Sequence, residues 1–196
     1  RPTTLTRHRL LEKLPINNPK RVTLVVADPG FGKTTLLADF SSRYPGRVLW
    51  YRLDETDRDW VTLVNYLIAA ARGTVRDFGR TTTTLLAPIT GASPSKRNVI
   101  ASLMRELQAL ADRPTTIVFD DFQAVEPSDD ANEFIGQLLR DAPVSFSFII
   151  SSRRRPSFPL ARWAVQGDLA ELSTDDLRFS HNRNGEAVCG SVWPAA

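Results

Sequence analysis

The sequence predicts an α/β fold in which helices cover a mostly parallel sheet. Apolar segments rich in β-branched residues recur along the chain, and segments with apolar residues three and four positions apart lie between them. This alternation is typical of α/β proteins. A loop with two glycines also joins the first such strand to the next helix, the position where many open α/β sheets bind ligands.

The predicted strands are short runs that lack polar alternation, as expected for strands buried on both faces: 21–27, 47–53, 115–121 and 145–152. Helical spacing of apolar residues predicts four long helices between or after them: 33–44, 59–72, 99–112 and 131–142. Pro114 and Pro143 lie where a helix should stop before the next strand. Residues 73–97, rich in Thr, Pro, Gly and Ser, are predicted to be a long surface loop or a partly disordered, flexible insertion.

Composition indicates one globular domain, which we assign to residues 1–180. The chain has 196 residues, 42% of them hydrophobic, which is sufficient for one sizeable core.

Apolar runs are far shorter than the roughly 20 residues of a membrane span, and the N-terminus lacks a secretory pattern, so we expect a cytoplasmic protein without membrane contact. One cysteine, Cys189, excludes an intrachain disulfide and a cysteine-rich zinc site. The charge of +3 comes partly from the arginine run at 151–156, which is more typical of a solvated loop than of a nucleic-acid surface.

The loop between the first strand and the first long helix has the residues of a phosphate-binding loop. Backbone N–H groups of such a loop and the helix N-terminus surround an anion. Gly30 and Gly32 permit close backbone approach, Lys33 can reach the β and γ phosphates, and the Thr34 hydroxyl can ligate Mg²⁺. Ala27 stands where the P-loop pattern has its first glycine. The predicted nucleotide-binding residues are Asp28, Pro29, Gly30, Phe31, Gly32, Lys33, Thr34 and Thr35.

Two carboxylates at the end of the strand 115–121 supply the second half of an NTP site. Asp120 is predicted to hold Mg²⁺ with Thr34, and Asp121 to orient or deprotonate the attacking water, with Lys33 as the other catalytic residue. The alternative is that the pair only caps the following turn. Together with the P-loop, this pair predicts a three-layer α/β/α P-loop NTPase that uses ATP or ADP with Mg²⁺.

Arg153 follows the strand 145–152, where a guanidinium can contact the γ-phosphate of a bound nucleotide. Such a contact would report whether that phosphate is present. Arg154 or Arg155 can serve instead, or Arg153 can be one solvent-facing member of the arginine run.

The ordered motifs resemble the nucleotide-binding domain of STAND-type P-loop ATPases, in particular the MalT-like, large LuxR-family transcriptional regulators. The resemblance rests on "LTRHRLLEKL", "ADPGFGKTTLLADF", "IVFDDFQAV", "FIISSRRRPSFPLAR" and "GDLAELSTDDLRFS". It implies that Arg7, Leu10 and Leu11 lie near the adenine base. It also implies the phosphate, Mg²⁺, acidic-pair and sensor roles of Lys33, Thr34, Asp120, Asp121 and Arg153.

The resemblance further implies a slowly hydrolysing switch that holds ADP when idle and exchanges it for ATP. Self-association is expected in the full-length protein, and DNA contact only through a separate C-terminal helix-turn-helix domain. We expect this chain to be a fragment without the sensor and DNA-binding domains. The tail 181–196 departs from the family pattern, and its Gly, Pro and Ala content predicts disorder.

Two other functions remain open from the sequence. P-loop small-molecule kinases share the same loop and sheet, and "SSRRRP" can serve as their basic lid. The chain can also be a nucleotide-independent interaction fragment.

Overall fold

The computed structural model describes residues 8–11, 13–15, 20–87, 94–181 and 187–189. The strands are β1 (Val22–Val26), β2 (Arg47–Arg52), β3 (Thr115–Asp120), β4 (Phe146–Ser152), β5 (Leu169–Leu172), β6 (Phe179–His181) and β7 (Ala187–Cys189). The α-helices are α1 (His8–Leu11), α2 (Lys33–Arg43), α3 (Trp60–Arg72), α4 (Arg80–Leu86), α5 (Lys96–Gln108), α6 (Asp129–Asp141), α7 (Ala161–Val165) and α8 (Thr174–Leu177). Two short 3₁₀ turns, η1 (Glu55–Arg58) and η2 (Phe122–Ala124), follow β2 and β3.

The main sheet is parallel throughout, with the strand order β2-β3-β4-β1-β5. This arrangement confirms the α/β prediction, and β1 to β4 are the four strands predicted from the sequence. The edge strand β5 was not among the predicted strands. The order places β4 between β1 and β3, so the segments that follow these three strands meet at one edge of the sheet.

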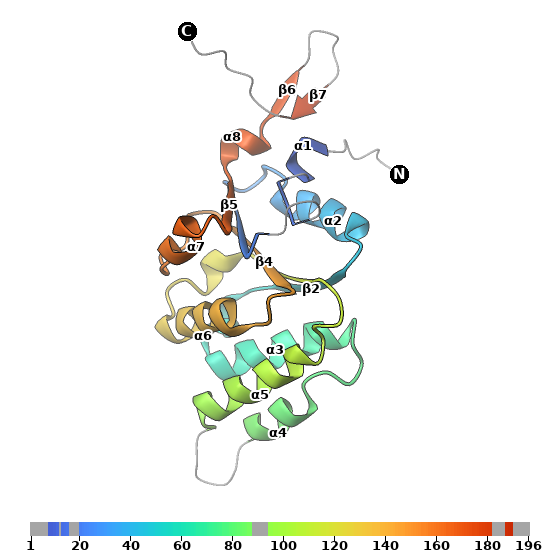
Figure 1. The fold of residues 1–196 in the computed structure, drawn as a ribbon. Coiled ribbons are helices and arrows are strands. Elements are labelled where there is room, and N and C mark those ends of the chain that lie inside the picture. The colour runs from blue at the N-terminus through green and yellow to red at the C-terminus, as the bar shows by residue number, and fades with distance from the viewer. Residues whose placement is uncertain (1–7, 12, 16–19, 88–93, 182–186, 190–196) are drawn as a thin grey trace.

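Helices cover both faces of this sheet. Figure 1 shows α3, α4 and α5 on one side and α1 and α2 on the other. Successive strand residues point to opposite faces, so Phe119 packs in the cluster with α3, α5 and α6, whereas Val118 packs with α1 and α2. By the same alternation, Asp120 lies on the face covered by α2. None of the helices in the described ranges has both the length and the apolar character of a membrane span.

The predicted loop over 73–97 is wrong for its central part, because Arg80–Leu86 forms the helix α4. Thr82 and Leu86 are buried against the core, and the Thr82 hydroxyl is hydrogen-bonded to Glu106 of α5. Glu106 also accepts the backbone N–H of Thr81 at 3.0 Å, which satisfies a donor in the first turn of α4. Residues 88–93 lie outside the described part of the chain.

The tail predicted to be disordered contains one paired segment. Ala187–Cys189 forms β7, which is antiparallel to β6. The prediction of disorder is therefore wrong for these residues. The remaining tail positions, 182–186 and 190–196, lie outside the described residues.

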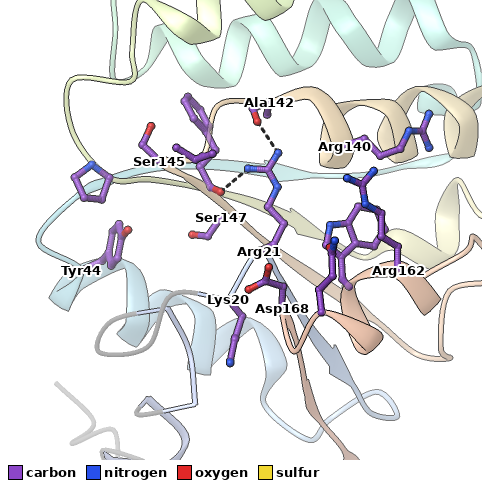
Figure 2. Close-up of a pocket in the computed structure, with 14 residues that line it drawn as sticks. Lys20, Arg21, Tyr44, Arg140, Ala142, Ser145, Ser147, Arg162 and Asp168 are labelled. Carbon is purple, nitrogen blue, oxygen red and sulfur yellow. Dashed lines mark hydrogen bonds between the residues drawn. The ribbon is translucent and has the colours of Figure 1, made fainter.

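Arg21 joins the start of β1 to the end of α6. Its guanidinium donates hydrogen bonds to the backbone carbonyl oxygens of Leu139 at 2.8 Å, Ala142 at 2.6 Å, Pro143 at 2.8 Å and Phe146 at 2.9 Å. Figure 2 shows the bond to Ala142. These acceptors include carbonyls at the end of α6, which have no partner within the helix. Burial lowers the pKa of Arg21 from its ordinary value, and the opposite charges of Asp168 and Asp141 partly offset this effect.

We expect Arg21→Leu to lower the free energy of unfolding by about 3 kcal/mol, because it leaves several part-buried carbonyl oxygens without a donor. Urea unfolding monitored by circular dichroism measures this change. Arg113→Leu is the matched control, since Arg113 is exposed and, among the residues that the structure describes, pairs only with neighbouring Asp112 at 3.6 Å. Equal losses in the two variants would contradict the role assigned to Arg21.

Candidate functional site

The loop between β1 and α2 has the backbone geometry that phosphate binding needs. Gly30 and Gly32 have positive φ angles of 88° and 74°, which side chains rarely adopt. A Cβ atom placed on Gly30 would meet nothing within 4 Å, so the space beside this glycine is open. The helix α2 begins at Lys33, as predicted, and its N-cap residue Gly32 has no side chain that could cap it. The first backbone N–H groups of α2 are therefore available to a ligand.

Lys33 lies beneath this loop and is buried. Its Nζ donates to the backbone carbonyl oxygens of Ala27 at 2.5 Å and Asp28 at 3.2 Å. Burial lowers the pKa of Lys33, and the nearby charges of Asp121 and Asp120 oppose this effect. A phosphate group would give this ammonium a charged partner in place of two carbonyl oxygens.

Asp120 connects the ends of three elements. It is buried at the end of β3, and its Oδ2 accepts a hydrogen bond from Thr34 Oγ1 at 3.1 Å. Its Oδ1 accepts a hydrogen bond from Ser151 Oγ of β4. The sequence placed Asp120 and Thr34 in one site, and the structure brings them into contact. Ser151 was missed, because a serine in an apolar strand is no signal until the neighbouring strand is known.

Asp121 has a carboxylate whose hydrogen-bond partners differ from those of the Asp120 carboxylate. Its backbone is left-handed, with φ of 61°, a conformation that Asp and Asn tolerate better than most residues. Its carboxylate accepts hydrogen bonds from Arg52 Nε at 3.0 Å and Gln123 Nε2 at 2.9 Å. Burial raises the pKa of Asp121, but the hydrogen bonds from Gln123 and Arg52, together with the charges of Arg52 and Lys33, outweigh this effect and hold it below its ordinary value.

Arg52 and Gln123 were also missed by the sequence analysis. Arg52 is paired in register with Asp120 at the carboxyl ends of β2 and β3, but that pairing could not be read from the sequence. Gln123 links the acidic pair to the arginine run, since its Oε1 accepts the backbone N–H of Arg153 at 3.1 Å. Arg52, Asp121, Gln123 and Arg153 line one open cavity of about 420 Å³.

The remaining predicted residues differ in placement. Arg153 is exposed, and its charge is near enough to Lys33 to lower the pKa of that lysine. Leu10 and Leu11 are buried in the cluster that contains Leu36 and Leu37 of α2. Arg7 lies outside the described residues. Asp28, Pro29, Thr34 and Thr35 are exposed around the loop, and Phe31 is half-buried.

The low pKa of Asp121 predicts a small acid-sensitive stabilisation. A folded-state pKa below 3.8 stabilises the fold above that pH, and the effect disappears as the pH falls through the folded value. Arg52 is 75% exposed and Asp121 25%, so we expect Asp121→Asn to cost only about 0.5–1 kcal/mol at pH 7. The free-energy difference from the wild type should shrink below about pH 4, as measured by urea unfolding. A difference that stays constant down to low pH would contradict this assignment.

Solved structures of similar fold include a signal transduction ATPase, whose likeness supports the fold. A signal transduction ATPase with numerous domains (STAND) from Pyrococcus horikoshii, which carries a tetratricopeptide repeat sensor, matches with a TM-score of 0.52 and 16% identity. That match covers 89% of this chain and 24% of the other. Drosophila ORC bound to DNA matches with a TM-score of 0.49 and 14% identity over 88% of this chain and 44% of the other. The Walker-type ATPase of Pyrococcus abyssi matches with a TM-score of 0.46 and 17% identity over 78% and 46%.

The chain therefore spans about a quarter of the first of these chains and less than half of the other two. At such identities the likeness to the STAND protein speaks for the fold alone. The family is shown by a different comparison. The family model described as AAA ATPase domain matches residues 4–150, more than half of the 196 residues and all of the loop and acidic pair described above. The chain belongs to the AAA ATPase domain family.

Proposed function

We propose that this AAA-type P-loop ATPase domain is the nucleotide switch of a signal-responsive bacterial transcriptional regulator of the MalT-like, large LuxR-family type. It would bind ATP or ADP with Mg²⁺, hydrolyse ATP slowly and act in the cytoplasm. Self-association and DNA binding would belong to the full-length regulator. The regulator assignment is supported by the ordered sequence motifs, and the nucleotide site by the geometry around the loop.

The observation that carries the proposal is the hydrogen bond of 3.1 Å between Thr34 Oγ1 and Asp120 Oδ2. It places the hydroxyl of the P-loop helix beside a buried carboxylate, which is the oxygen pair that a Mg²⁺–nucleotide site uses. Among the described residues, no three His, Cys, Asp or Glu side chains come together as a metal cluster. Thr34 and Asp120 would thus hold Mg²⁺ only together with phosphate oxygens and water, so metal and nucleotide would bind as one unit.

Lys33 and the loop fit the phosphates themselves. The open space beside Gly30 leaves room for phosphate oxygens. The Lys33 ammonium donates a hydrogen bond to the backbone carbonyl oxygen of Asp28 in the same loop. Burial lowers the pKa of Lys33, and a bound phosphate would stabilise the charged form of this lysine. When bound, Mg²⁺ would neutralise charge on the β and γ phosphates.

Asp121 is better suited to orienting the attacking water molecule than to accepting a proton from it. Its carboxylate stays ionised at neutral pH because its pKa lies below the ordinary value. Such a weak base holds a water molecule by accepting its hydrogen bond, whereas an efficient proton acceptor has a pKa near the working pH. Weak basicity is consistent with slow turnover.

Two substitutions separate nucleotide binding from ATP hydrolysis. Lys33→Met keeps the aliphatic stem but removes the ammonium, so we expect it to abolish binding of ATP and ADP in calorimetric titrations with Mg²⁺. Asp121→Asn suits the left-handed backbone and should spare binding while lowering ATP hydrolysis about a hundredfold.

Circular dichroism and unfolding curves of both variants serve as the folding control. Unchanged hydrolysis by Asp121→Asn would overturn its assignment, and a folded wild-type chain that binds no nucleotide would favour an interaction fragment. Transfer of the phosphate to an acceptor other than water would identify a small-molecule kinase.

A substitution of Arg153 tests whether this residue senses the γ-phosphate. We expect Arg153→Ala to weaken ATP binding about tenfold while leaving ADP binding unchanged, because one charge-assisted hydrogen bond to phosphate is lost. Titration with each nucleotide measures the ratio. Arg154→Ala is the matched control from the same arginine run. A larger effect of Arg154→Ala would transfer the sensor role to that neighbour.

A further inference from the structure

A second cavity, of about 430 Å³, lies at the opposite edge of the sheet from the P-loop. Residues at or just before the amino ends of β1, β3 and β4 line it, together with the ends of α6 and α7 (Figure 2). Its volume is in the range of ligand-binding pockets. No part of the nucleotide site reaches this edge, because the P-loop, Asp120 and Arg153 all follow the carboxyl ends of strands. We call this the amino-edge cavity.

Basic side chains surround the cavity, but they are not equivalent. Arg21 is occupied by backbone carbonyl oxygens, and Lys20 donates to the Gly167 carbonyl oxygen at 2.8 Å. Arg140 and Arg162 are exposed, and within the described ranges neither guanidinium has an ion pair or a hydrogen bond. Figure 2 shows both on the same side of Arg21. The two arginines are therefore the cations available to a ligand.

The local charges leave a positive excess at this side. Asp168 and Asp141 attract Arg21, whereas Arg162 repels it. Asp168 is the acidic residue that lines the cavity, against Lys20, Arg21, Arg140 and Arg162. Unpaired arginines that gather around a cavity favour a ligand with carboxylates or other anionic groups, since guanidinium pairs best with such planar acceptors.

Two polar groups of the lining also lack partners within the described residues. Ser145 Oγ is buried without a hydrogen-bond partner. The Trp163 indole N–H has no acceptor among the described residues either, and it is not fully buried. Because an indole N–H donates one hydrogen bond, this group is available to a bound peptide backbone or carboxylate.

The apolar part of this surface indicates the size of the ligand. Tyr44, Pro114 and Trp163 line the cavity, and Val144 at its rim is 101% exposed. A small molecule inside the cavity would leave Val144 in water. A protein segment that crosses the rim would cover it, and exposed apolar side chains beside a pocket are typical of protein contacts.

We propose that the amino-edge cavity is a docking site for an acidic segment of a partner protein, in which a large apolar side chain is flanked by carboxylates. The apolar side chain would enter the cavity beside Trp163, and the carboxylates would pair with Arg140 and Arg162. The segment would cross the rim over Val144. This proposal goes beyond the nucleotide switch and does not depend on it.

The probe is a fluorescein-labelled peptide, Gly-Glu-Glu-Phe-Glu-Glu-Gly, whose binding is followed by fluorescence anisotropy at low salt. Arg140→Glu and Arg162→Glu should each weaken binding at least about tenfold, because an attraction becomes a repulsion. Arg97→Glu, at an exposed arginine of α5 that does not line the cavity, is the matched control and should leave binding unchanged. Nucleotide titrations should be the same for all three variants, which separates this test from that of the switch.

Two further peptides test the chemistry of recognition. A version with Gln in place of Glu and one with Ala in place of Phe should both bind at least about tenfold more weakly. Equal binding of the Gln peptide, or no saturable binding of the Glu peptide by folded protein, would overturn the proposal. Displacement by phenylacetate at the same concentration as the peptide would identify a small organic acid instead. Sedimentation that reveals self-association, lost in Arg162→Glu, would identify a second copy as the occupant and overturn the partner assignment.

Discussion

The architecture of the candidate site depends on one buried carboxylate. Asp120 is 1% exposed, and it is satisfied by hydroxyl groups from two other elements, Thr34 of α2 and Ser151 of β4. A buried charge is costly unless such partners are in place. The strand order makes this possible, because β4 lies between β1 and β3 and the carboxyl ends of all three meet. The side chain of Asp120 thus links α2, β3 and β4 at this edge of the sheet.

Sequence reasoning succeeded where the local pattern and the tertiary environment agree. Strands buried on both faces need continuous apolar, β-branched runs, and these runs located β1 to β4 correctly. It failed for α4, where threonine-rich sequence has weak helix propensity and no clear apolar period. That helix is stabilised from outside: Thr82 is buried against α5, and Arg72 of α3 donates to the Thr83 hydroxyl at 3.1 Å. Tertiary contacts of this kind cannot be read from local sequence.

The site was predicted in part for a related reason. Lys33, Thr34, Asp120 and Asp121 belong to contiguous motifs, so their residue types and spacing identified them before any neighbour was known. Arg52, Gln123 and Ser151 become meaningful only through contacts between elements. These three residues bind the two carboxylates and so set the environment of each. Arg52 and Gln123 bind the Asp121 carboxylate and lower its pKa, so the two adjacent acids have different environments.

The two edges of the parallel sheet use positive charge in opposite ways. At the carboxyl edge, the helix N-terminus and Lys33 face a loop built around glycines, so a phosphate can approach the backbone. At the amino edge, the carbonyl end of α6 needs donors, and Arg21 supplies them. Arg140, in the last turn of the same helix, and Arg162 of α7 do not donate to these carbonyl oxygens. Arginines without a protein partner, beside the exposed Val144, are what distinguish this surface for recognition from a helix cap.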